Sequence, residues 1–177
     1  MRQEDKITEK SSLYHHLESK SVGELLEDIN REDHKVADAV KEALPQIEAL
    51  VVEAEKRMKR GGRVFYIGAG TSGRLGVLDA SELPPTFGVP STLVSGLIAG
   101  GDTALRNAVE NAEDMTAQGW ADLQKFKPNA DDTLIGIAAS GTTPYVIGAI
   151  REARAHHMLT GCITSNPSTP LAEASEF

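Results

Sequence analysis

The sequence predicts an α/β fold, with a doubly wound parallel sheet preceded by N-terminal helices. Between residue 61 and the end of the chain, four segments typical of strands alternate with segments typical of helices, in the order βαβαβαβ. The strand segments are rich in Val, Ile, Leu and Thr and lack the clean alternation of apolar and polar residues that half-exposed strands show. Such runs are expected of parallel strands that helices cover on both faces.

The elements of this sheet can be placed along the chain by composition. Each strand segment is short and apolar, and helical segments separate it from the next strand. The expected strands are residues 63–67, 92–98, 133–138 and 159–164. The expected helices are residues 72–83, 103–115, 120–125 and 144–157, with the start of another at 170–175.

Two different patterns precede the sheet. Residues 1–20 carry little pattern and are expected to form an arm, whereas residues 21–60 are expected to be helical. Ser21 and Glu24 have the spacing of a capping box, which predicts the start of a short helix that ends near Ile29.

A longer helix is expected from Asp33 onward. Apolar residues recur there at steps of three and four, which predicts one apolar face along the helix. These residues are Val36, Val40, Leu44, Ile47, Val51, Ala54 and Met58. Pro45 predicts a kink or a join between two helices, and Gly61 with Gly62 predicts the end of the helix.

The composition excludes several classes of protein. A chain of 177 residues suits one α/β domain with some extra helix, and the formal net charge of -8 disfavours a nucleic-acid surface. No run approaches the roughly 18 apolar residues of a membrane span. The single cysteine, Cys162, is expected to be a small buried thiol, and with the five histidines it shows no spacing typical of a metal site. These features favour a cytoplasmic protein without a nucleic-acid or membrane partner.

Two loops have the composition of anion sites. One follows the first strand and opens a helix, and the other follows the third strand and precedes Pro144. In an open parallel sheet, ligands bind at the carboxyl ends of the strands, where glycine allows close approach and helix N-termini favour negative charge. The candidate binding residues are Thr71, Ser72 and Gly73 in the first loop and Ser140, Gly141, Thr142 and Thr143 in the second. Plain helix capping is the alternative interpretation, and residues 165–168 form a third loop that could equally be a turn.

Two glutamates are candidates for proton transfer. Glu113 is expected at the border of the apolar face of the helix at 103–115, where a carboxylate can be half-buried and its pKa raised. Glu82 is expected to end its helix immediately before Pro84 and Pro85, an unfavourable place for a negative charge. An acid in such a place indicates function more than stability. Arg74 could supply positive charge to a ligand, which a phosphate would need in an acidic chain, or could be a surface residue.

Four stretches of the chain closely resemble motifs of the N-acetylmuramic acid 6-phosphate etherase family. They are residues 66–86, 96–101, 108–114 and 136–145. The similarity runs from about Ile7 to the final residue, and these motifs are far longer and more specific than a single glycine pattern.

This resemblance implies a flavodoxin-like SIS domain over residues 61–177 that binds a phosphorylated amino sugar. The family eliminates D-lactate from its substrate and then adds water, without a metal or other cofactor, in the use or recycling of cell-wall amino sugars. The family's acid for the departing lactate falls on Glu82, and its second catalytic carboxylate falls on Glu113. The phosphate-binding hydroxyls would come from Thr71, Ser72, Ser140, Thr142 and Thr143.

The resemblance also implies a homodimer, with sites near the interface. Family members continue well beyond Phe177, so the SIS domain of this chain is expected to be incomplete at its C-terminus. Two alternatives follow, a non-catalytic phosphosugar-sensing regulator on the same fold and an inactive fragment of the etherase. A sugar-phosphate isomerase or a DNA-binding regulator with the same domain is a further alternative, and the acidic N-terminal helices count against the DNA-binding one.

Overall fold

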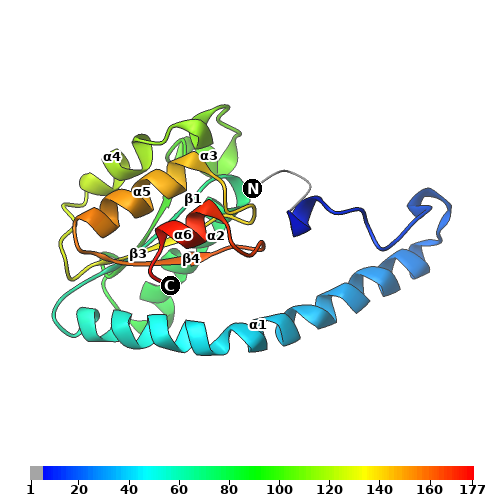
Figure 1. The fold of residues 1–177 in the computed structure, drawn as a ribbon, viewed down its shortest axis with the longest axis horizontal. Coiled ribbons are helices and arrows are strands. Elements are labelled where there is room, and N and C mark those ends of the chain that lie inside the picture. Colours follow the sequence, from blue (N-terminus) through cyan, green and yellow to red (C-terminus); the bar gives the residue numbers. More distant parts are fainter. Residues whose placement is uncertain (1–5) are drawn as a thin grey trace.

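The computed structural model describes residues 6–177 and contains a four-stranded parallel sheet (Figure 1). The strands are β1 (Val64–Gly68), β2 (Val94–Ile98), β3 (Thr133–Ile137) and β4 (Leu159–Ile163). They lie in the order β2-β1-β3-β4. The four strands predicted from the sequence are confirmed, and the order places the topological switch point between β1 and β3.

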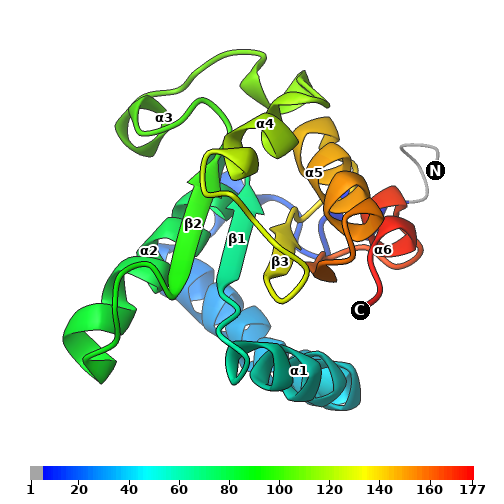
Figure 2. The same cartoon turned by 90° about the vertical axis from the view of Figure 1, so that its left-hand side faces the viewer.

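Helices cover both faces of this sheet, as the doubly wound fold requires (Figure 2). The helices that follow the first are α2 (Gly70–Phe87), α3 (Thr103–Arg106), α4 (Gln118–Gln124), α5 (Pro144–Ala155) and α6 (Pro170–Ala174). On one face the core includes Phe65 and Ile67, fully buried against α4, α5 and α6. On the other face, Val64 and Val94 pack with Ala80 of α2. Burial of each large side chain contributes about 1.5–3 kcal/mol.

The first helix, α1 (Val22–Met58), is a single helix of 37 residues. Its predicted capping box is confirmed, because the Glu24 amide donates to Ser21 Oγ at 3.3 Å and the Ser21 amide donates to a Glu24 carboxylate oxygen at 2.7 Å. The predicted break after Ile29 is wrong, and Pro45 neither ends the helix nor joins two helices. No glycine or proline interrupts the helix between residues 24 and 44, and a proline within it removes only one backbone hydrogen bond.

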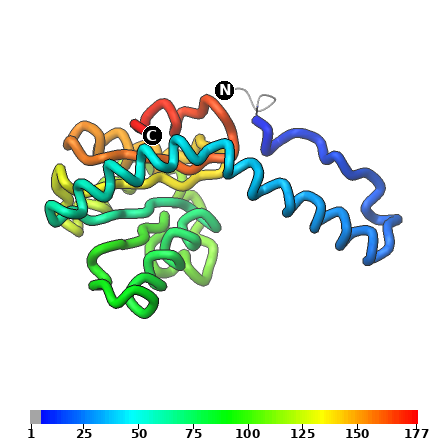
Figure 3. The backbone as a smooth tube through the Cα atoms, turned by 90° about the horizontal axis from the view of Figure 1, so that it is seen from below, coloured from blue at the N-terminus to red at the C-terminus, as the bar shows by residue number. Residues whose placement is uncertain are grey.

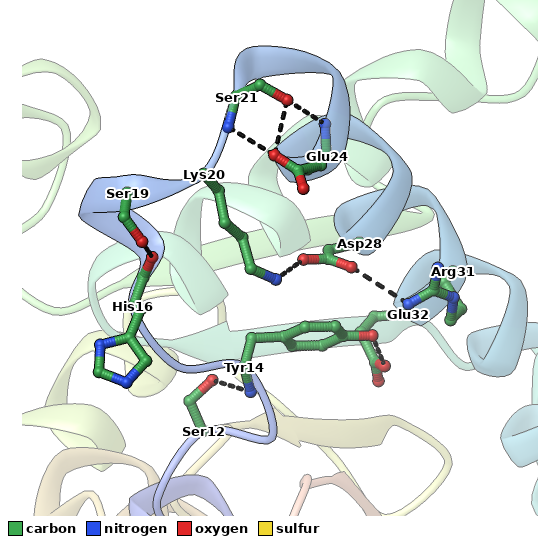
Figure 4. A network of polar contacts seen from close by, with 10 residues as sticks. All are labelled: Ser12, Tyr14, His16, Ser19, Lys20, Ser21, Glu24, Asp28, Arg31 and Glu32. Carbon is green, nitrogen blue, oxygen red and sulfur yellow. Dashed lines mark hydrogen bonds and ion pairs between the residues drawn. The ribbon is translucent and has the colours of Figure 1, made fainter.

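The N-terminal part of α1 projects from the body of the molecule, and the arm runs back beside it (Figures 1 and 3). Within the expected arm at 1–20, residues 1–5 lie outside the described residues, and the rest contains two short 3₁₀ turns at Ile7–Glu9 and Leu17–Ser19. Figure 4 shows how the arm is tied to the helix: Tyr14 donates to Glu32 at 2.6 Å, and Lys20 pairs with Asp28.

The apolar face predicted for α1 exists but is largely exposed in this single chain. Val36 is 59% exposed and Ile47 is 42% exposed, whereas Ala54 near the end of the helix is buried. Leu50 contacts the sheet, because its side chain occupies the space that a Cβ atom at Gly161 would need. Among residues 6–177, no helix is long and apolar enough to cross a membrane.

Two predicted helices differ from the structure near the candidate glutamates. The helix expected at 72–83 continues to Phe87, through Pro84 and Pro85, and ends at Gly88 in the left-handed conformation, with φ of 66°. The prediction that Glu82 ends its helix is therefore wrong. The helix continues because two prolines near its C-terminus remove only two backbone hydrogen bonds while their φ angles suit a helix.

The prediction of a helix at 103–115 is also wrong, because α3 ends after one turn, at Arg106. Asn107 is extended, and a 3₁₀ turn follows at Ala112–Asp114. The cause is Arg74, which donates to the carbonyl oxygens of Ala104 at 2.8 Å and Leu105 at 3.1 Å. In a longer helix these two carbonyls would accept from backbone amides four residues onward, so the arginine takes the place of the next turn.

Candidate functional site

The two predicted anion loops lie side by side at the carboxyl end of the sheet. β1 and β3 are parallel neighbours, and Gly68 at the end of one pairs with Ile137 at the end of the other. Each loop leads directly into a helix, α2 after β1 and α5 after β3. The structure therefore brings two helix N-termini to the switch point, where backbone N–H groups without intrahelical partners can meet one ligand.

The first loop is short, and its candidate residues belong to the first turn of α2. The N-cap is Ala69, which has no side chain able to cap the helix, and Gly70 has a φ of 53°. A Cβ atom added at Gly73 would lie 2.6 Å from Ile98 Cγ1 and 2.8 Å from the Gly68 carbonyl oxygen. Glycine at this position therefore lets α2 start against the strand ends, which leaves Thr71 exposed and Ser72 partly buried at the rim.

The second loop is a small hydrogen-bonded turn of hydroxyl groups. The Thr142 amide and hydroxyl both lie within hydrogen-bond distance of Ser140 Oγ, at 3.2 and 3.1 Å. Gly141 has a φ of 67°, and a Cβ atom there would lie 2.4 Å from the Thr169 side chain. Thr143 is the N-cap of α5, but within the described residues its side chain makes no capping hydrogen bond. Plain helix capping therefore does not explain the hydroxyl of Thr143.

Asn166, in the third loop at residues 165–168, is hydrogen bonded to the backbone of the second loop. Its side chain is 2% exposed, and Nδ2 lies within 3.3 Å of the carbonyl oxygens of Ala139 and Ser140. From the sequence alone, residues 165–168 could equally be a simple turn. The available signal was an asparagine three positions after the last strand, since a loop there falls at the same edge of a parallel sheet as the other two loops.

Glu113 lies beside the first loop rather than on a helix border. It lines a cavity of about 260 Å³ together with Gly70, Arg74 and Glu110. We call this cavity the Glu113 hollow. Glu113 is exposed, so the predicted half-burial is wrong, and the reason is the early end of α3 described above. The guanidinium of Arg74 lines the same hollow while it donates to two backbone carbonyls.

Glu82 lies away from this rim in the single chain. It is exposed on α2, and it follows Gly70 by twelve positions. At a rise of 1.5 Å per residue it lies about 18 Å farther along the helix axis. The structure therefore places the two loops at one edge of the sheet, with Glu113 in a hollow that Gly70 and Arg74 at the start of α2 also line, but it does not bring Glu82 to them within one chain.

Among the described residues outside α1, three groups have shifted pKa values: Tyr145, Tyr66 and Asp122. Burial and the Asp122 carboxylate raise the pKa of the Tyr145 hydroxyl, and burial with the neighbouring Asp79 raises the pKa of Tyr66 to about 12. Burial opposes ionisation of Asp122, but hydrogen bonds from Lys125, Gln118 and Tyr145 outweigh it and lower the pKa of that carboxyl. Both phenols stay protonated at neutral pH, so they are not proton acceptors for a reaction at the rim. Within residues 6–177, no group of three His, Cys, Asp or Glu side chains is placed to hold a metal ion.

Comparison with known proteins gives one family and several close relatives. The family model described as the glucokinase regulatory protein N-terminal SIS domain matches residues 44–154. A protein of Bacteroides thetaiotaomicron named N-acetylmuramic acid 6-phosphate etherase is 68% identical over 97% of this chain and 62% of its own length. One of Christiangramia forsetii with the same name is 62% identical over 100% of this chain and 65% of its own length. The chain thus spans less than two thirds of these relatives, and the resemblance stated from the motifs is confirmed.

Solved structures share the fold at lower identity. A phosphoheptose isomerase of Neisseria gonorrhoeae superposes with a TM-score of 0.62 and 20% identity, over 86% of this chain and 81% of that one. A phosphoheptose isomerase of Francisella tularensis gives a TM-score of 0.60 and 23% identity, over 85% and 81%. These likenesses support the predicted SIS-type architecture.

Proposed function

The chain belongs to the glucokinase regulatory protein N-terminal SIS domain family. From its 62–68% identity to proteins named N-acetylmuramic acid 6-phosphate etherase, we propose that it acts in such an etherase. The reaction proposed is cleavage of the D-lactyl ether to give N-acetylglucosamine 6-phosphate and D-lactate. The observation that carries the proposal is the pair of adjoining loops at the switch point, within a chain 68% identical to a protein of that name. The activity is proposed for the whole protein, of which this chain corresponds to about three fifths of the relatives' length.

The 6-phosphate of the sugar is the group proposed to bind at the two helix N-termini. Ser140, Thr142 and Thr143 offer hydroxyls at one of them, and Thr71 and Ser72 offer hydroxyls at the other. A dianion there interacts with the positive ends of two helix dipoles and with first-turn amides. Binding energy from this unreactive end of the substrate holds the sugar in place for the reaction.

The proposed reaction needs one base and one acid. The base removes a proton from the carbon beside the sugar's aldehyde, and the bond between the neighbouring carbon and the lactyl oxygen breaks. The acid gives a proton to the departing oxygen, which releases D-lactate, and water then adds across the new carbon–carbon double bond. We assign Glu113 as the base, because it lies in the hollow beside the first loop, and Glu82 as the acid. No metal or other cofactor is part of this proposal.

A second copy of the chain is proposed to supply Glu82. Glu82 lies about 18 Å along α2 from the rim of its own chain, too far for proton transfer at the Glu113 hollow. The long exposed apolar face of α1, with Val40 48% exposed and Val51 57% exposed, supports a homodimer because monomers rarely leave such a face uncovered. A twofold dimer would then form two equal sites, each with Glu113 of one chain and Glu82 of the other.

The test is lactate release by two variants, measured separately and mixed. Glu82→Gln and Glu113→Gln each remove one carboxylate, and we expect each to lose lactate release while N-acetylglucosamine 6-phosphate still binds. Mixing them through unfolding and refolding yields mixed dimers in which one site has both glutamates. If Glu82 acts across the dimer, activity returns to about a quarter of the wild-type rate. No recovery would contradict the shared site, and loss of sugar-phosphate binding by Glu82→Gln would make that residue structural.

A non-catalytic phosphosugar sensor is the second candidate function. The matching family model is that of a regulatory protein, which favours this alternative. A sensor needs the phosphate loops but not the two carboxylates. Binding of N-acetylglucosamine 6-phosphate without lactate release from the substrate by the wild-type chain would support the sensor, or an inactive fragment of the etherase.

For the etherase we propose a cytoplasmic role in the use or recycling of cell-wall amino sugars.

A further inference from the structure

The N-terminal segment of the chain reaches the rim of the sheet and is fixed there by Asn166. The Thr8 amide donates to Asn166 Oδ1 at 3.2 Å, and Asn166 Nδ2 donates to Thr8 Oγ1 at 3.0 Å. The same Nδ2 lies close to the carbonyl oxygens of Ala139 and Ser140. One buried amide therefore joins the N-terminal segment to the second anion loop, although 158 positions separate Thr8 from Asn166.

This attachment places Lys6 on the second loop. Lys6 is partly buried, and its Nζ donates to Thr142 Oγ1 at 3.3 Å. The Thr142 hydroxyl in turn donates to Ser140 Oγ at 3.1 Å. A lysine ammonium, a serine hydroxyl and a threonine hydroxyl thus form one chain of hydrogen bonds at the start of α5.

A phosphate bound at this loop would require a nearby cation to stabilise its negative charge. The chain carries a formal net charge of -8, so an approaching dianion is repelled unless positive potential is concentrated at the site. Arg74, the cation expected from the sequence, donates to the carbonyls of Ala104 and Leu105 beside the Glu113 hollow. Lys6 is the basic side chain hydrogen bonded to the loop itself, and lysine is an effective phosphate partner as a mobile point charge.

We propose that Lys6 is a phosphate-binding residue and that residues 6–9 form a strap that holds Lys6 over the second loop. The inference rests on the proposed phosphate site. Nζ donates to Thr142, one of the hydroxyls proposed to bind the phosphate, so the ammonium is within reach of an anion that this hydroxyl contacts. Because Asn166 contacts both the strap and the loop, an anion that orders the loop also holds the strap.

Binding of N-acetylglucosamine 6-phosphate, measured by titration calorimetry, tests the role of Lys6. We expect Lys6→Gln to weaken binding by about 10- to 100-fold, the value of a hydrogen bond to a charged group, and Lys6→Arg to restore most of it. Lys10→Gln is the matched control, since Lys10 is exposed in the same segment and the same charge is lost. If Lys6→Gln and Lys10→Gln weaken binding of the sugar phosphate equally, the effect comes from net charge alone, and the proposal is overturned.

A second measurement separates failure of this inference from failure of the proposed function. The wild-type chain is titrated with N-acetylglucosamine 6-phosphate, with inorganic phosphate and with N-acetylglucosamine. If neither N-acetylglucosamine 6-phosphate nor inorganic phosphate binds, the proposed anion site is wrong, and the proposal of the strap is overturned with it. If they bind and Lys6→Gln binds them equally well, the strap alone is overturned.

The strap itself is tested through hydrogen exchange at the Thr8 amide. We expect N-acetylglucosamine 6-phosphate to slow this exchange in the wild type and to have no such effect in Asn166→Ala, which lacks the acceptor. Thr8→Val keeps the amide but removes the hydroxyl partner, and we expect it to bind the probe several-fold more weakly than wild type. If the probe leaves hydrogen exchange at the Thr8 amide of the wild type unchanged, the strap is not stabilised by the anion and the proposal is overturned.

Discussion

The two ends of the sheet use polar groups in opposite ways. At the amino end, Asp132 is fully buried and accepts from the Arg63 amide at 2.8 Å, the Arg63 guanidinium at 2.7 Å and the Asn129 amide at 2.9 Å. At the carboxyl end, Ser140 and Thr142 bond mainly to each other and to Lys6, at the start of a helix. Polar groups that satisfy one another rigidify the protein, whereas hydroxyls at a helix N-terminus remain available to a ligand.

The largest effect expected from this comparison is at the amino end. Asp132→Ala removes a buried carboxylate and leaves the partly buried Arg63 without its partner, so the free energy of unfolding should fall by about 3–5 kcal/mol. Urea denaturation followed by circular dichroism measures the change. Asp131→Ala is the control, because that carboxylate is 42% exposed in its pair with Arg60, and its loss should change stability by less than about 1 kcal/mol.

The next effect is expected at the carboxyl end and on binding. Ser140→Ala combined with Thr142→Ala should weaken binding of N-acetylglucosamine 6-phosphate by about 10- to 100-fold, because hydrogen bonds to the phosphate are lost. Stability should change by no more than about 1 kcal/mol, since these hydroxyls bond mainly to each other. Ser81→Ala, which removes an exposed hydroxyl on α2, should alter neither quantity. Unchanged affinity in the double variant would place the anion site elsewhere.

Arg74 lies at the carboxyl end, but its guanidinium already donates hydrogen bonds to two backbone carbonyls, as the polar groups at the amino end do. Arg74→Ala should release the carbonyls of Ala104 and Leu105 and loosen the segment that carries Glu113. We expect a loss of about 1–2 kcal/mol of stability and a lower kcat with little change in KM, because the phosphate loops are untouched. If KM rises instead while kcat is unchanged, Arg74 contacts the substrate rather than positioning Glu113.

The smallest effect concerns Asp122, which lies on α4 and lines a second cavity with Gly100 and Gly101, just after β2. Its pKa is lowered in the folded chain, so its ionised form stabilises the fold above the unfolded pKa of about 3.9. This contribution is lost as pH falls through the lower folded value. The stability difference between the wild type and Asp122→Asn should therefore stay constant from about pH 7 to 5 and shrink below about pH 4. A difference that instead grows as pH falls would contradict the assigned direction.

Local sequence patterns were sufficient to predict the sheet and to place the two candidate loops at its carboxyl edge. Each strand was placed from a short apolar run, because parallel strands buried on both faces need such runs wherever they occur. Ser140 and Thr142 were predicted as candidate ligands of an anion because glycine and hydroxyl residues stand there between a strand and a helix, and their role stays a prediction. The predicted environments of Glu82 and Glu113 were wrong. Both predictions depended on where a helix ends, and the periodicity of apolar residues does not define helix ends.

Sequence alone was enough to predict the order of strands and helices, the capping box at Ser21 and the composition of the two loops, since these depend on residues a few positions apart. The tertiary structure was needed to place the end of the helix after β2, because Arg74 reaches its carbonyls from 31 positions away. It also decided that Lys6 meets Thr142 across 136 positions and that Glu82 lies far from Glu113 within one chain. Contacts between distant segments depend on how the chain packs in three dimensions, and no local periodicity encodes that packing.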